Sequence, residues 1–344
     1  MMNPTEFSPL PKEERLTRPL NRVGHNMCQQ RWYRGRTLFR PCDERGFCID
    51  WHLNQRTGGK FMSQRETYCL IGAGAMAEAI LSGLLKNKRA SAEQIRLINR
   101  ENADRLRQME SAYGIRCPRQ KEKAIADANT IILAVKPKDM DQVLKQYKDD
   151  IRPGQRVISV AAGISTSFIE ERLPRGTTVI RAMPNTSSMI GRSATALCGG
   201  AYATEEDLNS ASATFSSIGS VVRVEEKDMD AVTGLSGSGP AYIYYLVEGL
   251  ERAGVNAGLS HPVARQLTLQ TLVGAAHMLL ETGEDPAQLR HKVTSPGGTT
   301  MAGVQSLADH DFHQTLITAV KRAQKRSKEL ASPCPLRHCA DDPV

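Results

Sequence analysis

The stretch TYCLIGAGAMAEAILSGLL, residues 67–85, constrains the fold of this chain more than any other part of the sequence. A short apolar run of strand character leads into a glycine-rich turn, which is followed by apolar residues at helical spacing. Gly72 and Gly74 permit a tight turn and a close approach of the backbone to a diphosphate, and Ala77 stands where the common fingerprint has a third glycine. The order strand, turn, helix therefore predicts a dinucleotide-binding unit.

Apolar, strand-like runs recur along the first half of the chain and alternate with helical patterns. The runs cover 94–99, 130–137, 156–163 and 177–186, and the helical segments cover 103–113, 139–147 and 165–172. This alternation predicts a Rossmann-like, doubly wound parallel sheet. Cofactor contacts in such sheets come from loops at the carboxyl ends of strands, where Lys136, Gly163, Pro184 and Asn185 fall. Each of these four residues is also compatible with ordinary turn chemistry.

The second strand ends at Asn99 and Arg100. Enzymes that use NAD commonly place an acidic residue here, which bonds the ribose 2′-hydroxyl. An amide and a guanidinium instead suit a 2′-phosphate through charge-assisted hydrogen bonds. The pattern predicts NADPH as the preferred cofactor over NADH, with a solvated turn arginine as the alternative.

The charge of the chain is unevenly distributed. The formal net charge is +8, but residues 1–61 alone hold 11 Lys and Arg against 6 Asp and Glu. The remaining body is close to neutral, which argues against a nucleic-acid-binding stripe. No apolar run has the length of a membrane span, so we expect no membrane partner.

The eight cysteines include no C-x-x-C pair, and those between residues 69 and 198 lie in strand-like apolar runs. This usage indicates reduced thiols and a cytoplasmic protein. Cys42, Cys48 and His52 are conceivable metal ligands, but their spacing matches no standard zinc pattern, so we expect no metal.

Four segments are expected along the chain. Residues 1–61 are rich in arginine and poor in apolar periodicity, and we expect a leader that is disordered or not part of the native chain. A dinucleotide-binding domain is expected over 62–224, a helical domain for substrate binding and dimerisation over 225–332, and a tail over 333–344.

The second half of the chain changes to long helical periods. The segment 264–283 is apolar on nearly every face, so it must be buried, and a partner subunit is one way to bury it. Two polar turns, GLSGSGPAY at 234–242 and TSPGGTT at 294–300, place hydroxyls and free N–H groups just before helices. Such turns suit a small carboxylate substrate. The alternative for the second turn is a plain helix connection capped by Thr299 or Thr300.

From about residue 67 to 330 the chain resembles the pyrroline-5-carboxylate reductases. The resemblance rests on GAGAMAEAI, AVKP, MPNT, GLSGSGPAY and SPGGTTMAG, which occur in the order and spacing of that family. Ser187 departs from the pattern, because the family often has proline after MPNT. The leader and the residues after Ser332 do not match.

The resemblance implies a reductase of proline biosynthesis that uses NADPH, with NADH possible, and forms a homodimer or a higher oligomer of dimers. Its active site would lie between the cofactor domain and helices of both subunits. Ser295, Gly297, Gly298 and Thr299 would hold the substrate carboxylate, and Thr300 would be catalytic, nearest the ring nitrogen of the imine. The implied cofactor-binding residues are Gly72, Gly74, Ala75, Met76, Asn99, Arg100, Ala134, Val135, Lys136, Pro137, Asn185, Gly237, Ser238 and Gly239.

Two other functions fit the sequence less well. A hydroxy-acid dehydrogenase of similar build generally needs a helix-borne lysine for the alcohol proton, yet 240–283 contains no lysine and Lys136 belongs to the cofactor half. A non-catalytic relative that keeps the fold for regulation or assembly is disfavoured because the SPGGTT turn is intact.

Overall fold

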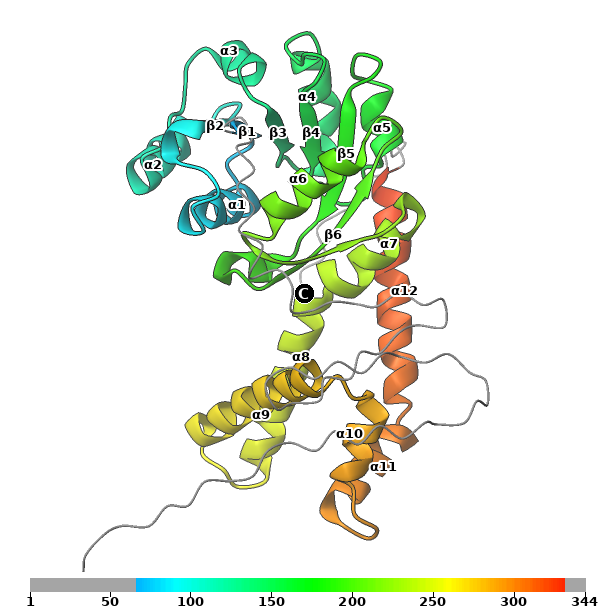
Figure 1. The fold of residues 1–344 in the computed structure, drawn as a ribbon. Helices are drawn as coiled ribbons and strands as arrows, with labels where there is room; N and C mark the ends of the chain where they lie inside the picture. Colours follow the sequence, from blue (N-terminus) through cyan, green and yellow to red (C-terminus); the bar gives the residue numbers. More distant parts are fainter. Residues whose placement is uncertain (1–65, 332–344) are drawn as a thin grey trace, which may run out of the picture. The chain divides into compact units, whose positions relative to one another are not determined.

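The computed structural model describes residues 66–331, in which a mostly parallel sheet is followed by a helical region (Figure 1). The leader 1–61, its conceivable metal ligands and the tail 333–344 lie outside the described residues. The strands are β1 (Tyr68–Ile71), β2 (Ile95–Ile98), β3 (Thr130–Leu133), β4 (Arg156–Ser159), β5 (Thr178–Met183), β6 (Ser193–Gly199) and β7 (Gly219–Arg223).

The strand order is β2-β1-β3-β4-β5-β6-β7, and every neighbouring pair is parallel except β5 with β6. The predicted doubly wound sheet is confirmed over its first five strands. β6 and β7 were not predicted, because β6 is built mainly from small residues and β7 is mostly half-buried or exposed. Neither strand shows the long apolar run that marks a strand buried on both faces.

Helices cover both faces of the sheet. They are α1 (Ala75–Lys86), α2 (Ala103–Tyr113), α3 (Lys121–Ala126), α4 (Met140–Tyr147), α5 (Thr166–Glu170) and α6 (Glu205–Phe215). Alternate residues of β1 face opposite sides: Leu70 joins a core with α1, α2 and α6, whereas Cys69 joins a core with α3, α4 and α5. Burial on both faces explains why the strands read as continuous apolar runs.

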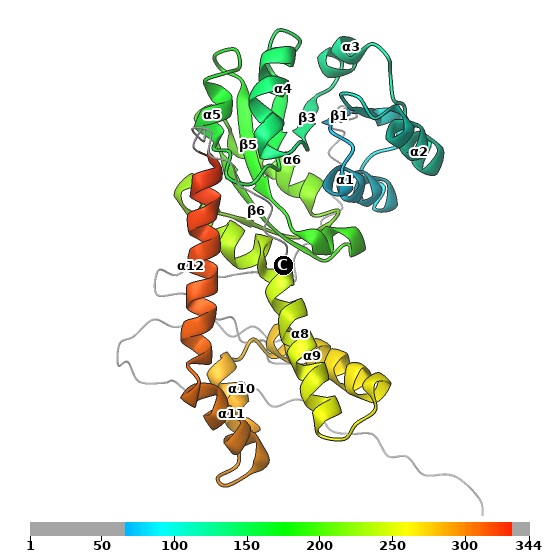
Figure 2. The same cartoon turned by 180° about the vertical axis from the view of Figure 1, so that it is seen from behind.

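The helical region begins after η5 (Glu226–Asp228). It contains α7 (Met229–Val232), the π-helical turn η6 (Thr233–Gly237), α8 (Gly239–Asn256), α9 (His261–Thr282), α10 (Pro286–Lys292), α11 (Thr299–Asp309) and α12 (Phe312–Ala331). α8 packs against α9, and α12 returns to pack against α7 and η6 (Figures 1 and 2). A Cβ on Gly234 would lie 2.7 Å from the carbonyl oxygen of Val320, so a side chain there would push α12 away.

A buried ion-pair network joins the sheet to the helical region. The guanidinium of Arg181 on β5, with 3% of its side chain exposed, pairs with Glu226 of η5 and lies 3.5 Å from Asp230 of α7. Ser327 of α12 donates a 2.7 Å hydrogen bond to Asp230. Because removing one member would leave a buried charge uncompensated, the network favours a single placement of α7 and α12 on the sheet.

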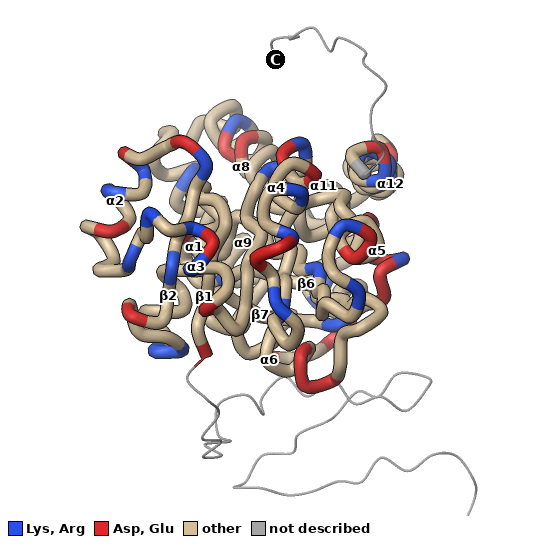
Figure 3. The backbone as a smooth tube through the Cα atoms, turned by 90° about the horizontal axis from the view of Figure 1, so that it is seen from above, with Lys and Arg blue, Asp and Glu red and all other residues tan. Residues whose placement is uncertain are grey.

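The helices α8 and α9 expose many large apolar side chains. Among residues 66–331, Ala264 is the only residue of α9 that is buried, whereas Leu267, Val273 and Leu280 are 55%, 51% and 60% exposed. The part of the chain that the structure describes therefore does not supply the expected burial of this helix. Between residues 66 and 331 no helix combines the length and apolarity needed to cross a membrane. Basic and acidic residues are interspersed along the backbone (Figure 3).

Candidate active site

The turn between β1 and α1 is shaped by Gly72. Its φ is +109°, and a Cβ at this position would collide with the carbonyl oxygen of Ala134 after β3. Its N–H donates a 2.9 Å hydrogen bond to the carbonyl of Ile98 at the end of β2. Glycine is thus required here both by conformation and by space. The ends of β1, β2 and β3 meet at this point, beside the position where the strand order reverses.

Gly74 is the N-cap of α1, and no side chain caps this helix end. A Cβ on Gly74 would meet no atom within 4 Å, so packing within the protein does not explain this glycine. The first N–H groups of the helix, from Ala75 onward, have no intrahelical acceptor and face an open space with the positive end of the helix dipole. This turn fits the diphosphate of a dinucleotide.

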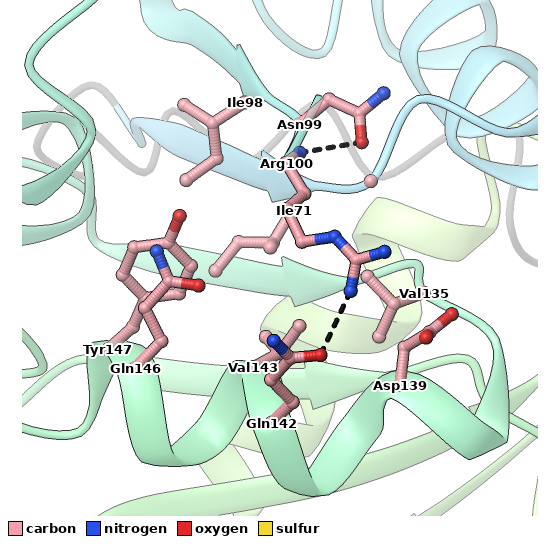
Figure 4. A pocket seen from close by; sticks show the side chains of 11 residues that line it. Ile71, Ile98, Asn99, Arg100, Val135, Asp139, Gln142, Val143, Gln146 and Tyr147 are labelled. Atoms are coloured by element: carbon pink, nitrogen blue, oxygen red, sulfur yellow. Dashed lines mark hydrogen bonds between the residues drawn. The ribbon is translucent and has the colours of Figure 1, made fainter. Parts of the chain in front are cut away.

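A pocket opens beside the glycine turn, at the carboxyl ends of β1, β2 and β3 (Figure 4). Asn99 and Arg100, two of the predicted residues at the end of β2, line this pocket together with Val135 after β3. α4 and the short helix η3 (Pro137–Asp139) close its other side. The lining residues are Ile71, Gly72, Ile98, Asn99, Arg100, Val135, Asp139, Gln142, Val143, Gln146 and Tyr147.

Arg100 is held at the edge of this pocket by two side chains. Its Nη1 donates a 2.9 Å hydrogen bond to Oε1 of Gln142, and its Nε lies 2.9 Å from a carboxylate oxygen of Glu101. Sequence reasoning missed Gln142, because a glutamine on an amphipathic helix looks the same whether it faces a pocket or water. Lys136, which was predicted beside the cofactor, is exposed and does not line this pocket.

The loop after β5 brings Asn185 close to the glycine turn. The short helix η4 (Thr186–Ile190), which Asn185 caps by accepting a 3.1 Å hydrogen bond from the N–H of Ser187, packs against α1. Ser188 contacts Met76 through a 3.7 Å hydroxyl-to-sulfur hydrogen bond. Asn185 also donates from Nδ2 to the carbonyl of Ser236, at 3.0 Å. Asn185 therefore links η4, which contacts the predicted Met76, to the carbonyl of Ser236 within the motif GLSGSGPAY.

The first polar turn differs from its prediction. Residues 233–237 form a π-helical turn rather than a loop, and the N–H of Ser238 donates a 2.9 Å hydrogen bond to the carbonyl of Thr233. The prediction of free N–H groups is therefore wrong for Ser238, because the helical ladder continues through this turn. The hydroxyl of Ser238 has no hydrogen-bond partner among residues 66–331, in contrast to those of Ser236 and Tyr242.

The second polar turn opens α11. Its N-cap is Gly298, with no side-chain cap, and Thr299 and Thr300 are the first helical residues. The alternative of a threonine cap is therefore wrong. Gly297 has a φ of +70°, and the N–H of Gly298 donates a 3.0 Å hydrogen bond to the carbonyl of Ser295. The side chains of both threonines are exposed, next to helix N–H groups that lack acceptors.

The structure does not bring this second turn next to the glycine turn. α11 packs mainly against α12, and both views place it away from α1 (Figures 1 and 2). Within one chain the turns at Thr300 and Gly74 are therefore two separate parts of the candidate site, here called half-sites. Each half-site has an uncapped helix N-terminus preceded by glycine.

Two buried cysteine thiols of the sheet stay neutral, which makes them poor nucleophiles. Burial raises the pKa of the Cys69 thiol on β1 to about 12, which keeps it neutral. Burial, followed by the charge of Glu226, raises the pKa of the Cys198 thiol to about 12. In residues 66–331 no three His, Cys, Asp or Glu side chains are grouped as a metal site.

Comparison with known proteins covers both halves of the chain. A family model described as pyrroline-5-carboxylate reductase dimerisation matches residues 226–330, and one described as NADP oxidoreductase, coenzyme F420-dependent, matches residues 67–163. Pyrroline-5-carboxylate reductase 1 of Bacillus spizizenii is 46% identical over 261 residues, which cover 76% of this chain and 88% of that protein.

Two solved structures are similar over most of the chain. A pyrroline-5-carboxylate reductase from Coxiella burnetii has a TM-score of 0.74 and 35% identity, covering 78% of this chain and 100% of that chain. A pyrroline carboxylate reductase from Plasmodium falciparum, solved with NADP bound, has a TM-score of 0.70 and 28% identity, covering 78% of this chain and 98% of that chain.

The two glycines of the turn predict opposite effects on folding and binding. Gly74→Ala introduces a methyl group that meets no protein atom, so stability in urea should hardly change while affinity for the dinucleotide falls on the order of tenfold. Gly72→Ala forces an alanine into a left-handed conformation and a backbone clash, so it should lower the free energy of unfolding by about 1–3 kcal/mol. Unchanged dinucleotide binding by a folded Gly74→Ala variant, in a fluorescence titration, would place the diphosphate elsewhere.

Proposed function

The chain belongs to the pyrroline-5-carboxylate reductase family, and on that basis we propose that it reduces 1-pyrroline-5-carboxylate to L-proline with a nicotinamide cofactor. It is then an oxidoreductase of proline biosynthesis. The observation that carries the proposal is the presence, in one chain, of a diphosphate-ready turn at Gly74 and of an uncapped helix end with free hydroxyls at Thr300.

The substrate is a five-membered cyclic imine that bears a carboxylate. A bound reduced nicotinamide supplies the hydride for the imine carbon. In our proposal the hydroxyl of Thr300 donates a hydrogen bond to the ring nitrogen, which makes the adjacent carbon a better hydride acceptor. Ser295 and the N–H of Thr299 hold the carboxylate, and Gly297 and Gly298 shape the turn for it. Because neither polar turn contains a histidine or a carboxylate, positioning contributes more than acid catalysis.

NADPH is the preferred cofactor in this proposal. The guanidinium of Arg100 stands at the end of β2, where a ribose 2′-phosphate would be expected, and Gln142 holds it at the pocket edge at 2.9 Å. The pairing with Glu101 is exposed, so it competes weakly with a phosphate.

We further propose that a homodimer completes the active site. The exposed apolar faces of α8 and α9 need a cover, and α11 carries Thr300 on a helix that does not pack on the sheet of its own chain. The turn at 294–300 of one subunit then faces the glycine turn of the other, and higher oligomers are built from such dimers.

The proposed domain organisation separates cofactor binding from substrate binding and dimerisation. We propose a dinucleotide-binding domain over 62–224 and a helical substrate and dimerisation domain over 225–332, with a dispensable leader over 1–61 and a tail over 333–344. Free Cys69, Cys117 and Cys198 support a cytoplasmic location, which cell fractionation tests. A chain that starts at Met62 and folds, yet lacks activity, would contradict the assignment of the leader.

The proposed activity is tested by NADPH oxidation on addition of pyrroline-5-carboxylate, with Thr300→Val as the diagnostic variant. Valine keeps the β-branched shape, so α11 should still form. If the hydroxyl acts in the transition state, kcat and kcat/KM should fall together by a factor of roughly 10²–10³. The loss should be smaller if a water molecule replaces the hydroxyl. Ser295→Ala is the matched comparison and should mainly raise KM, because the substrate carboxylate is present throughout the reaction. Unchanged kcat for Thr300→Val would remove this residue from the mechanism.

Cofactor preference is tested by Arg100→Ala. Loss of a charge-assisted contact to the 2′-phosphate should weaken NADPH binding about tenfold, the lower end of the range for such bonds because the side chain is half exposed. NADH, which lacks that phosphate, should bind as before. Equal losses for the two cofactors, measured by titration, would contradict the role of Arg100.

The shared site is tested by complementation between two defective chains. Gly74→Glu places a carboxylate at the proposed diphosphate position, and Thr300→Val removes the hydroxyl. If each site combines both subunits, a heterodimer contains one intact site, and co-expressed chains should regain about one quarter of the wild-type activity. Sites contained within single chains would give no recovery.

A further inference from the structure

The turn η6 interrupts an otherwise α-helical backbone between α7 and α8 with a single π-helical turn. Such turns widen the helix by one residue and displace backbone carbonyls from their usual donors. They persist only where surrounding groups compensate, and they are frequent at functional sites. At this turn the compensating groups are two side-chain donors.

Two carbonyls of the turn lack their ordinary α-helical donors. The N–H of Ser238, which would donate to the carbonyl of Gly234 in an α-helix, donates instead to Thr233, at 2.9 Å. The carbonyl of Ser236 would accept from residue 240, but Pro240 has no N–H. Leaving either carbonyl without a donor in this buried or half-buried turn would destabilise the π conformation.

Two side chains donate to these same carbonyls. Nδ2 of Asn185 donates to the carbonyl of Ser236 at 3.0 Å, and the hydroxyl of Tyr242 donates to the carbonyl of Gly234 at 3.1 Å. Both side chains belong to half-buried residues. Tyr242 acts from the following turn of α8, whereas Asn185 acts from the loop that packs on α1. The π turn is therefore stabilised by one donor from its own helix and by one donor from the loop after β5.

Neighbouring contacts leave the turn little freedom to move. Gly234 lies directly against the backbone of α12, and a Cβ on Gly237 would collide with the side chain of Met183, the last residue of β5. The turn leads into Ser238 and Gly239, which were predicted to bind the cofactor, and Asn185 joins it to the loop at the carboxyl end of β5. A shift of this backbone would displace the residues predicted to contact the cofactor.

We propose that Asn185 and Tyr242 are positioning residues for hydride transfer, acting through the carbonyls of Ser236 and Gly234 to hold the π turn at 233–237 against the nicotinamide. This inference rests on the proposed reductase function. Neither residue needs to touch the substrate for this role. Affinity for the dinucleotide should depend more on the diphosphate turn and on Arg100 than on the hydroxyl of Tyr242.

The test compares variants of the full chain in single-turnover experiments with NADPH and pyrroline-5-carboxylate. Tyr242→Phe removes only the hydroxyl. Asn185→Asp keeps the acceptor that caps η4 but replaces the donor to Ser236. Tyr202→Phe, at an exposed site between β6 and α6, is the matched control for loss of a tyrosine hydroxyl. Stopped-flow absorbance gives the rate constant of NADPH oxidation and, separately, its amplitude.

Tyr242→Phe and Asn185→Asp should each lower the rate constant by roughly 10- to 100-fold, and the dissociation constant of Tyr242→Phe for NADPH should stay within a factor of about three of wild type. Because both act through one turn, the double variant should lose less than the product of the single losses. Tyr202→Phe should match wild type. A purely structural role would lower the amplitude, which counts active molecules, and leave the rate constant unchanged.

That last outcome would overturn the inference, as would unchanged kinetics in both variants. The inference and the proposed function can fail separately. An active wild-type chain with unaffected variants contradicts positioning alone, whereas a folded wild-type chain that does not oxidise NADPH with this substrate contradicts the reductase function and the inference with it.

Discussion

Gly72 brings the ends of β1 and β3 so close together that no side chain fits between its α-carbon and the carbonyl of Ala134. The rest of the cofactor half-site depends on this approach. It sets the direction of α1, whose uncapped end lies next to the pocket formed by β1, β2 and β3. η4 then packs on α1 and carries Asn185 to the π turn, so a backbone constraint in the first strand reaches the helical region.

Both half-sites use backbone groups that the fold leaves unpaired. α1 and α11 each begin after a glycine with no side-chain cap, although caps stabilise helices and occur elsewhere in this chain, as at Asn102 and Thr204. An uncapped end is a loss of stability that a bound anion can offset. α1 packs beside the sheet whereas α11 packs mainly against α12, so assembly of two chains is part of the proposed chemistry.

Sequence patterns predicted some features well because those features depend on local spacing. β1 to β5, the glycine turn and the change to long helices all follow from periodicity and glycine placement within short windows. β6 was not predicted because its small residues match neither the helical nor the strand periodicity. Gln142 was not predicted because its partner Arg100 is distant in sequence. The π turn was not predicted because a stretch rich in glycine and serine is typical of a loop. Its helical form depends on donors to its carbonyls that come from other parts of the fold.

By itself, the sequence determined a doubly wound sheet, a dinucleotide turn at Gly72 and Gly74, and a helical second half with two polar turns. Only the tertiary structure decided how these parts meet. It placed Asn185 against Ser236 and Gln142 against Arg100, and it separated Thr300 from the glycine turn of its own chain. The physical reason is range: strand and helix patterns arise between residues a few positions apart, whereas the site arises from contacts between segments about 40 to 50 residues apart, which only packing selects.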